Sequence, residues 1–318
     1  MTVRRFLPGG SDAGVLLGLA IVAAIFGALV GPAFFRVANV ELMARQTVIV
    51  AVAALGMTMI IVSGGIDLSV GSIDSLSTVV VALLLPGYGP ALAALGAVAA
   101  GGLCGAVNGL LITKLRVVPF IVTLGTMLLV RGAAKGLAGE RRIEAPITWL
   151  NDLLRTARDG RGLLLPTGIW LTAALAIVVA LMLRYTRFGR HLFAIGSNER
   201  TARLCGVRID RTKVAVYTIG AALAGLAGVL EFSKLSVGDP TVAVGFELDV
   251  IAAVIIGGGS LLGGKGSVLG TLAGAAIMVV IQVGCSQQGL PNWVQQIVTG
   301  SIIIGAVALD RWRQTTTV

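Results

Sequence analysis

The stretch from Ser63 to Ser72, Ser-Gly-Gly-Ile-Asp-Leu-Ser-Val-Gly-Ser, places a carboxylate in apolar surroundings, and Asp74 follows seven residues after Asp67. A carboxylate at the centre of a bilayer costs about 2.5 to 3.5 kcal/mol, so it faces a bundle interior or water. The glycine pair before Asp67 allows a helix to break where it lines a cavity. Two interpretations follow. Asp67 caps the next helix by accepting the backbone N–H of Ser69 or Val70, or it lines a transport pathway.

Little else in the sequence could do chemistry. The chain has one histidine, His191, and its three cysteines, Cys104, Cys205 and Cys285, lack the spacing of a metal site or a disulfide framework. The run 259–266, Gly-Ser-Leu-Leu-Gly-Gly-Lys-Gly, begins like a phosphate-binding loop, but Gly266 stands where a Ser or Thr hydroxyl must hold magnesium. We therefore predict no catalytic residues, no metal ligands and no bound nucleotide or other cofactor in this chain.

The composition places these residues in a membrane protein. Apolar residues make up 56% of the chain and charged residues 13%, and the mean hydropathy is +0.94. An ordinary globular domain carries about 25% charged residues. The net charge of +10 would suit nucleic acid, but the basic residues lie beside apolar runs that leave no soluble domain for such a site. We predict a lipid bilayer as the surroundings and no nucleic-acid partner.

A helix needs about 20 apolar residues to cross a bilayer. Counted on this basis, the uncharged runs predict a single all-α membrane domain over 1–318 with ten transmembrane helices. Full crossings are predicted at 14–35, 46–66 and 162–183, and short helices that end inside the protein at 117–130, 214–230 and 250–264. The runs 75–113 and 266–309 are too long for one helix, and the stretches 86–90 and 286–292, which contain Pro and Gly, divide each into two. The first run resembles a signal peptide but lacks a clean cleavage site, so we predict a retained helix.

The segment 184–213 sets the orientation. It carries eight of the 25 Lys and Arg residues between two apolar runs, and short basic loops stay in the cytoplasm during insertion. With both termini cytoplasmic, ten crossings place 15 basic residues inside and 10 outside. Seven of those outside lie in 131–161, and we predict that 131–167 is an external segment lying on the membrane. Two interpretations of this basic loop remain: it only sets the topology, or it also forms a docking surface.

A second stretch is related to the one around Asp67. Setting Ile60 against Ile255 without gaps gives five identities in 13 columns. Internal repeats with broken helices are typical of transporters. We therefore predict two related halves, formed by crossings two to five and seven to ten.

Several motifs together resemble one family, the membrane permease subunits of bacterial ATP-binding-cassette (ABC) importers for ribose and related monosaccharides. The resemblance covers nearly the whole chain and includes the stretches 56–72, 118–126 and 248–258. It continues in Gly105-Ala-Val-Asn-Gly109, Thr186-Arg-Phe-Gly-Arg190, Ala194-Ile-Gly-Ser-Asn198 and Gly263-Gly-Lys-Gly-Ser-Val-Leu-Gly270.

The resemblance implies a subunit of the bacterial inner membrane that works only with partners. These are a second permease chain, identical or different, a periplasmic sugar-binding protein, and two cytoplasmic ATPase subunits that bind ATP and magnesium. In such permeases a short cytoplasmic helix docks on each ATPase through an Ala and a following Gly. The matching positions here are Asn198, Glu199, Ala202 and Gly206, with Arg203 where a small residue is often found. A small Ala202 would allow close approach, and Gly206 can end the helix.

A neutral sugar must bind along its path weakly enough to be released again. Uncharged side chains and helix ends offer such binding. The candidates are Gly64, Gly65, Asp67, Ser69, Asn108, Thr123 and Thr126; for each threonine, packing between helices is the alternative. The alternative function is an ion-coupled secondary transporter of a small polar solute, which would bury coupling carboxylates in its spans. Apart from Asp67 and Asp74, the predicted spans contain none. The motifs do not distinguish one sugar or polyol from another.

We predict that the substitution Gly206→Trp uncouples ATP hydrolysis from sugar uptake, because a bulky residue would disrupt the end of the docking helix. The measurement is uptake and ATP hydrolysis by the same reconstituted preparation. Wild-type uptake by the variant would contradict the docking role.

Overall fold

The computed structural model describes residues 10–155 and 166–315. The first nine residues and the part of the predicted external segment at 156–165 lie outside the described residues. In chain order the elements are α1 (Gly10–Val30), η1 (Pro32–Phe35), α2 (Val37–Val62), α3 (Val70–Leu115), α4 (Pro119–Ala138), β1 (Ile143–Glu144), η2 (Trp149–Leu153), α5 (Thr167–Tyr185), α6 (Arg187–Ser197), α7 (Glu199–Leu204), α8 (Ile209–Leu235), β2 (Val237–Gly238), α9 (Phe246–Ile256), α10 (Val268–Gln287) and α11 (Asn292–Thr315).

The predicted all-α membrane architecture is confirmed. Seven of the described helices, α1 to α5, α8 and α10, are long and apolar enough to cross a membrane. Helix α3 supplies two crossings, because its 46 residues contain a non-helical Gly89 (φ 76°) between Pro86 and Pro90. This is where the sequence predicted a division. The count of ten is approximate, since it needs α11 and also α9, whose 11 residues are fewer than a full crossing requires.

Several helices are longer than predicted, and α4 and α8 continue through the charged residue at which the prediction ended them. Helix α4 has 20 residues and runs through Arg131 to Ala138, so the segment predicted to be external from 131 begins as eight residues of helix. Helix α8 has 27 residues and runs through Glu231. The prediction ended both helices at a charged residue. These charges are tolerated because their side chains have partners within the protein, as Arg131 does below.

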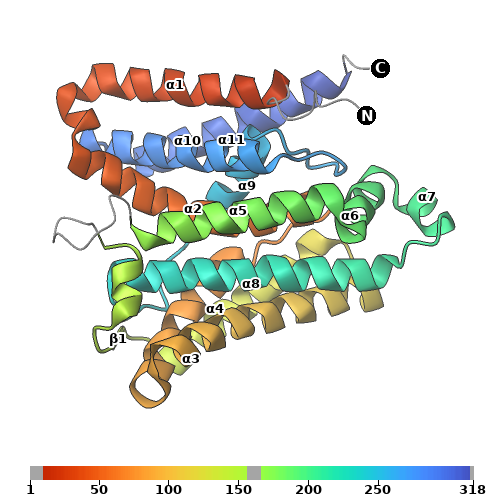
Figure 1. Cartoon of the computed structure of the whole chain (residues 1–318), viewed down its shortest axis with the longest axis horizontal. Helices are drawn as coiled ribbons and strands as arrows, with labels where there is room; N and C mark the ends of the chain where they lie inside the picture. Colours follow the sequence, from red (N-terminus) through yellow and green to blue (C-terminus); the bar gives the residue numbers. More distant parts are fainter. Residues whose placement is uncertain (1–9, 156–165, 316–318) are drawn as a thin grey trace.

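Helix α2 forms the centre of the molecule. Every residue from Val48 to Val62 is buried, and a helix that is apolar all round is expected in such a position. Figure 1 shows α2 and α5 in the middle, with α1, α10 and α11 on one side and α3, α4 and α8 on the other.

Helices α3 and α8 approach each other through small residues. Gly101, Gly105 and Gly109 are spaced by four and therefore share one face of α3. A Cβ on Gly105 would overlap the carbonyl oxygen of Tyr217, and one on Gly101 would come within 2.6 Å of the carbonyl oxygen of Ala221. Small residues at helix interfaces let backbones pack closely inside a membrane, so α3 and α8 behave as one unit.

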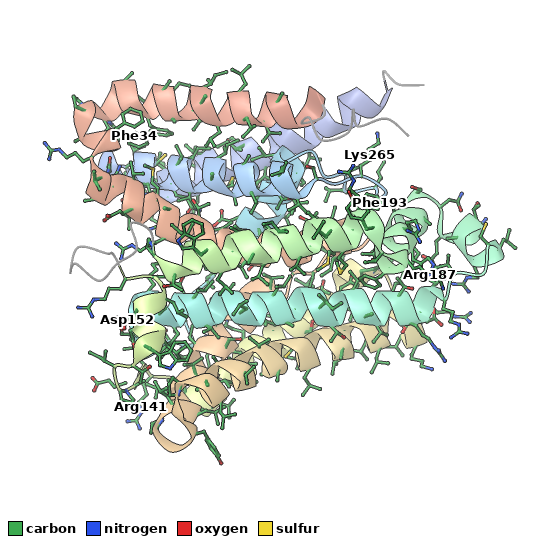
Figure 2. The ribbon with its side chains drawn as sticks, viewed as in Figure 1. Phe34, Arg141, Asp152, Arg187, Phe193 and Lys265 are labelled. Atoms are coloured by element: carbon green, nitrogen blue, oxygen red, sulfur yellow. The ribbon has the colours of Figure 1, made fainter. Side chains whose placement is uncertain are left out.

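The charged residues separate to two ends of the bundle. Figure 2 shows Arg187 and Lys265 at the end that carries α6 and α7, and Arg141 and Asp152 at the opposite end. We call these the basic-loop end and the β-sheet end, after segment 184–213 and the antiparallel pair β1–β2. Helix α1 begins and α11 ends at the basic-loop end (Figure 1).

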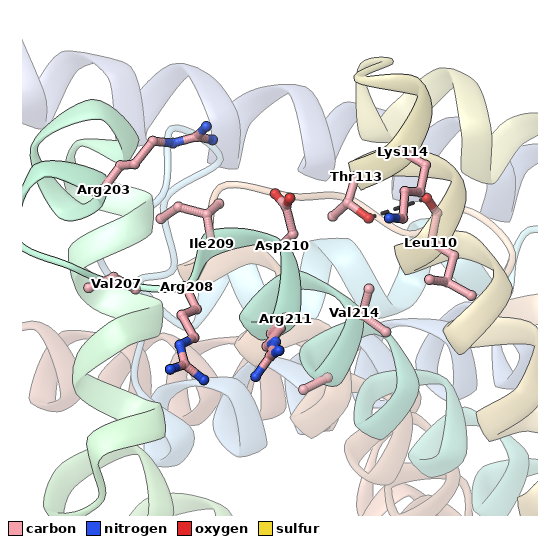
Figure 3. Close-up of a pocket in the computed structure, with 11 residues that line it drawn as sticks. Leu110, Thr113, Lys114, Arg203, Val207, Arg208, Ile209, Asp210, Arg211 and Val214 are labelled. Carbon is pink, nitrogen blue, oxygen red and sulfur yellow. Dashed lines mark hydrogen bonds between the residues drawn. The ribbon is translucent and has the colours of Figure 1, made fainter.

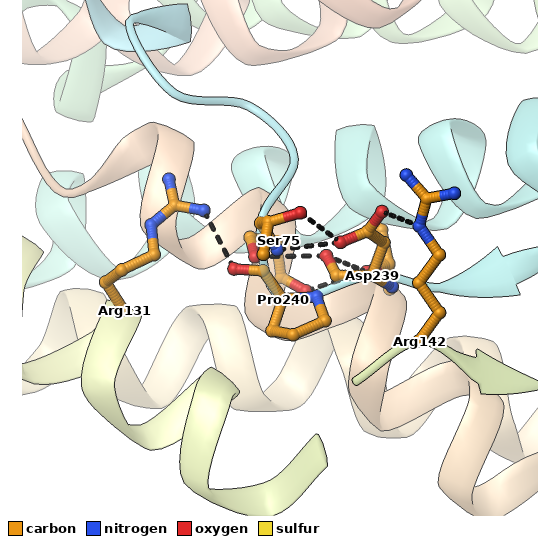
Figure 4. Close-up of polar contacts among 7 residues, drawn as sticks. Ser75, Arg131, Arg142, Asp239 and Pro240 are labelled. Carbon is orange, nitrogen blue, oxygen red and sulfur yellow. Dashed lines mark hydrogen bonds and ion pairs between the residues drawn. The ribbon is translucent and has the colours of Figure 1, made fainter. Parts of the chain in front are cut away.

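A polar clamp at the β-sheet end holds the connector between β2 and α9. The guanidinium of Arg131 donates hydrogen bonds to the carbonyl oxygens of Val242 (2.5 Å) and Ala243 (3.2 Å). Asp239 accepts a 2.6 Å hydrogen bond from Arg142 and another from the Thr241 hydroxyl, as Figure 4 shows in part. Burial alone would raise the pKa of Asp239, but these donors outweigh it and lower the pKa. The connector is therefore fixed, and with it the start of α9.

We predict that Gly105→Ala destabilises the protein by about 1 to 3 kcal/mol, the usual cost of overpacking. Gly132→Ala in α4 is the control, because a Cβ there meets nothing within 4 Å, and it should gain up to about 1 kcal/mol from helix propensity. The measurement is thermal unfolding in detergent. Equal melting temperatures for the two variants would contradict the close contact of α3 with α8.

Candidate functional site

The chain breaks between α2 and α3. Gly64 adopts φ +79°, in the left-handed region that favours glycine. Asp67 is fully buried, and its Oδ1 accepts hydrogen bonds from the backbone N–H (2.8 Å) and the hydroxyl (2.6 Å) of Ser69, just before α3 begins. The predicted hydrogen bond from the Ser69 N–H to Asp67 is therefore present, but Ser69 itself is the N-cap of α3 and no side chain caps that helix. The role of Asp67 in a pathway stays a prediction.

The structure brings most of the predicted path residues to this break. Asn108 donates a 3.0 Å hydrogen bond to the Ser69 hydroxyl, and Thr123 donates to the carbonyl oxygen of Ile66 at 3.3 Å. The same carbonyl accepts from the hydroxyl of Tyr217. Sequence reasoning missed Tyr217; the available signal was a tyrosine within an apolar run. Gly65 lies against that ring, since a Cβ on Gly65 would overlap the tyrosine hydroxyl.

Thr126 does not reach the break. Its hydroxyl donates a 3.1 Å hydrogen bond to the carbonyl of Thr123, one turn earlier on α4. Both threonine hydroxyls donate to backbone carbonyls, and both side chains are buried. These contacts fit the packing interpretation of the two threonines.

Three segments meet at the break through their backbones. Gly264, in the loop after α9, donates a 2.9 Å hydrogen bond from its N–H to the carbonyl oxygen of Val62. Gly196, near the end of α6, leaves no room for a Cβ, which would overlap that same carbonyl oxygen. A Cβ on Gly263 would lie 3.0 Å from the Cα of Gly64. We call these four glycines and Val62 the glycine junction.

The loop after α9 is the second half of the predicted repeat. It follows the short helix α9 and leads into α10, as the break follows α2 and leads into α3. The helices beside them, α2 and α10, contact each other through a 2.8 Å hydrogen bond between the hydroxyls of Thr58 and Thr271. The matched breaks pair α2, the second crossing, with α9, the eighth, whereas the predicted halves would pair the second crossing with the seventh, α8.

The predicted docking segment forms two short helices, α6 and α7. Asn198 caps α7 by accepting the backbone N–H of Thr201 at 2.9 Å. Gly206 (φ +82°) ends α7. The N–H of Gly206 donates to the carbonyl oxygen of Arg203, and the N–H of Val207 donates to the carbonyl oxygen of Ala202. This is the Schellman arrangement, so the prediction that Gly206 ends the helix is confirmed.

Glu199 fixes α7 to the start of α8. Its carboxylate accepts a 2.7 Å ion-pair contact from Lys213 and a 3.3 Å contact from Arg203. Burial alone would raise the pKa of Glu199, but these two cations lower it below its ordinary 4.5. A partly exposed pair of this kind contributes up to about 1 kcal/mol.

The position of Ala202 differs from the expectation of a docking contact. Only 4% of its surface is exposed, and it packs against Ile195 and Ile209 of the permease itself. Its small size lets α7 lie close to α6 and α8. The exposed apolar residue of α7 is Leu204, at 88% exposure, which sequence reasoning missed because a single leucine is no signal by itself.

A basic cavity adjoins α7. It measures about 650 Å³ and is lined by Lys114 of α3 together with Arg203, Arg208 and Arg211. Figure 3 shows Lys114 at the end of α3 beside the first turns of α8. Lys114 therefore lies at the same end as segment 184–213, as the predicted topology requires.

The prediction that only Asp67 and Asp74 lie within spans is wrong. Glu41 lies within α2 and Glu231 within α8, and Glu247 and Asp249 lie in the first turn of α9. Sequence reasoning missed them because it ended helices at charges.

Known proteins resemble this chain over most of its length. A family model described as "Branched-chain amino acid transport system / permease component" matches residues 39–307. The ribose import permease protein of Escherichia coli (strain K12) is 39% identical over 300 residues, covering 94% of this chain and 93% of that protein. The fructose import permease protein of Rhizobium meliloti is 32% identical over 98% of this chain and 88% of its own length. The L-arabinose ABC transporter permease protein of Azospirillum brasilense is 34% identical over 89% and 83%. No solved structure gives a significant match.

We predict that Gly196→Ala separates ATP hydrolysis from solute uptake, because the added Cβ must push the end of α6 away from Val62. The uptake rate should fall by about tenfold, the equivalent of about 1.4 kcal/mol and within the usual cost of overpacking. The ATPase rate should remain. Gly132→Ala is again the control, and parallel loss of hydrolysis and uptake in Gly196→Ala would contradict the prediction.

Proposed function

The chain belongs to the family of transport-system permease components, and from this we infer that it is the permease subunit of an ABC importer for a monosaccharide. The solute class is a ribose-like pentose, a hexose or a related polyol. The observation that carries this proposal is 39% identity to a ribose import permease over 94% of the chain. The names of the fructose and arabinose relatives support the same class.

The energy for transport comes from outside the chain. Two ATPase subunits, which hold ATP and magnesium, dock at the basic-loop end on α7. Leu204 offers an apolar contact there, and Arg200 and Arg203 of the same helix add exposed positive charge. The capped and ion-paired α7 is a rigid element, so a push on it reaches α6 and the glycine junction. A residue held by backbone caps loses little entropy on docking.

The basic-loop end faces the cytoplasm. Segment 184–213 and Lys114 lie there together, and short basic loops stay on the cytoplasmic side. Both ends of the chain then lie in the cytoplasm. The β-sheet end faces the periplasm, where a binding protein delivers the sugar, and a second permease chain completes the assembly.

An ion-coupled secondary transporter is the less favoured alternative. The carboxylates of α8 and α9 would suit ion coupling, but the curated relatives are import permeases, one of them named as an ABC transporter protein. The two functions make opposite predictions about the energy source.

The test is uptake of radiolabelled D-ribose by proteoliposomes that contain the permease, its ATPase subunits and its binding protein. We expect uptake only with ATP on the ATPase side and binding protein on the other side. Uptake that follows a sodium or proton gradient without ATP would contradict the proposal.

A matched pair of variants tests the docking element in the same assay. Leu204→Ser should weaken ATPase association and lower uptake, because it removes the exposed apolar contact of α7. Ile147→Ser is the control, since Ile147 is 81% exposed but follows β1 at the other end of the bundle. Equal behaviour of the two variants would contradict docking on α7.

A further inference from the structure

A polar cavity lies between α2, α9, α10 and α11, away from the break that sequence reasoning selected. It measures about 690 Å³. Six carboxamides line it, from Gln46, Gln282, Gln287, Asn292, Gln295 and Gln296. The hydroxyls of Ser286 and Thr299 and the carboxylate of Asp249 complete the polar lining.

A smaller chamber of about 240 Å³ continues this cavity toward α3. The two share Gln46, Asp249 and Gln282, and we call them together the amide tract. The smaller chamber adds Asp74, together with Glu231, whose carboxylate accepts a 3.0 Å hydrogen bond from Lys234.

Asp74 is the most informative group in the tract. Its side chain is 1% exposed and lines the smaller chamber, yet neither carboxylate oxygen has a hydrogen-bond partner among the described residues. A buried carboxylate without a partner is costly, so the position is explained by a ligand that donates hydrogen bonds. Asp249 is different, because its Oδ2 already accepts from Gln282 at 2.8 Å.

The chemistry of the lining favours a neutral polyol. A carboxamide offers two donors and an acceptor, and a carboxylate offers acceptors only, so adjacent hydroxyls of one sugar can bind both kinds of group. The cavity volume falls in the ordinary range for small-molecule sites, about 300 to 1,000 Å³. A dehydrated cation needs oxygens at about 2 to 2.6 Å, and the described residues contain no group of three or more His, Cys, Asp or Glu side chains placed to hold a metal ion.

The tract also runs in the direction that transport requires. Gln287 and Asn292 flank the turn between α10 and α11, which lies at the end opposite α6 and α7 (Figure 1). Asp74 lies on the first turns of α3, which begins directly after the break. Asp67 and Ser69 in the break, and Asn108 of α3 beside it, are fully buried. The tract therefore leads from the outer end inward and stops at a closed element.

We propose that the amide tract is the station at which the permease receives its monosaccharide, with Gln46, Gln282, Asp249 and Asp74 as the groups that bind its hydroxyls. This rests on the proposed function. It places recognition of hydroxyl groups in the outer half of the permease, and it leaves the break between α2 and α3 as the barrier that opens later.

The first test is D-ribose uptake in the complete proteoliposome system at saturating binding protein. Gln46→Leu and Gln282→Leu should each lower the maximal uptake rate about tenfold. Removing the carboxamide leaves a hydroxyl of the bound sugar without its hydrogen-bond partner. Assembly with the ATPase subunits should remain. Gln288→Leu is the matched control, because Gln288 lies in the turn after α10 but does not line the tract.

The second test does not depend on transport. In a Cys205→Ser background, Gln295→Cys should react with a hydrophilic thiosulfonate added to the outer side, and saturating D-ribose-loaded binding protein should slow the reaction. Thr126→Cys, at a buried position, should not react.

The outcomes distinguish a failure of the proposed function from a failure of the amide tract as a sugar station. If the wild type shows no ATP-dependent uptake, the proposed function fails, and the amide tract fails with it as a sugar station. If the wild type transports and both Gln→Leu variants keep wild-type rates, the proposed function stands and the amide tract is overturned. A Gln295→Cys side chain that does not react from outside also overturns it. If Gln282→Leu does not assemble because Asp249 loses its partner, Gln46→Leu decides.

Discussion

The structure depends on backbone contact between segments that are far apart in the sequence. At the glycine junction the carbonyl of Val62, the last residue of α2, accepts the N–H of Gly264 while the Cα of Gly196 packs against it. Contacts of this kind exist only where side chains are absent, and they leave no flexible atoms to absorb a displacement. A movement of α6 is therefore a movement of the break between α2 and α3.

This constraint connects the other features. Helix α7 is fixed by its caps and by Glu199, α6 joins it to the junction, and the junction joins the ends of α2 and α9. Asp67 accepts hydrogen bonds from Ser69 at the start of α3, and Asn108, on the same helix after its bend, donates to the Ser69 hydroxyl. The clamp around Arg131 and Asp239 fixes the start of α9 from the other end. The amide tract lies between these fixed points, and we expect a shift at the junction to change the shape of its inner end.

Much of this could be predicted from sequence, and the failures have physical causes. Apolar runs predicted the crossings, Gly89 between two prolines marked the bend of α3, and Gly206 ended α7 as expected. The prediction wrongly ended helices at charged residues. The sequence alone does not show that Arg131 donates hydrogen bonds to three backbone carbonyls that lie 109 to 112 residues further along the chain. Ala202 matched a docking pattern but faces inward, since the pattern fixes residue type and not the direction of the side chain. The amide tract was invisible, because its glutamines come from three helices and only packing brings them together.

We propose that work from ATP enters the permease through α7 on the cytoplasmic side. The native Cys205 directly follows α7 and is exposed, whereas Cys285 is buried and Cys104 is half-buried. The most direct measurement is labelling of Cys205 with a membrane-impermeant maleimide, with Cys205→Ser as the control. The account predicts labelling in inside-out vesicles, loss of labelling when ATPase subunits are bound, and none in intact cells. Labelling of Cys205 from the periplasmic side would contradict it.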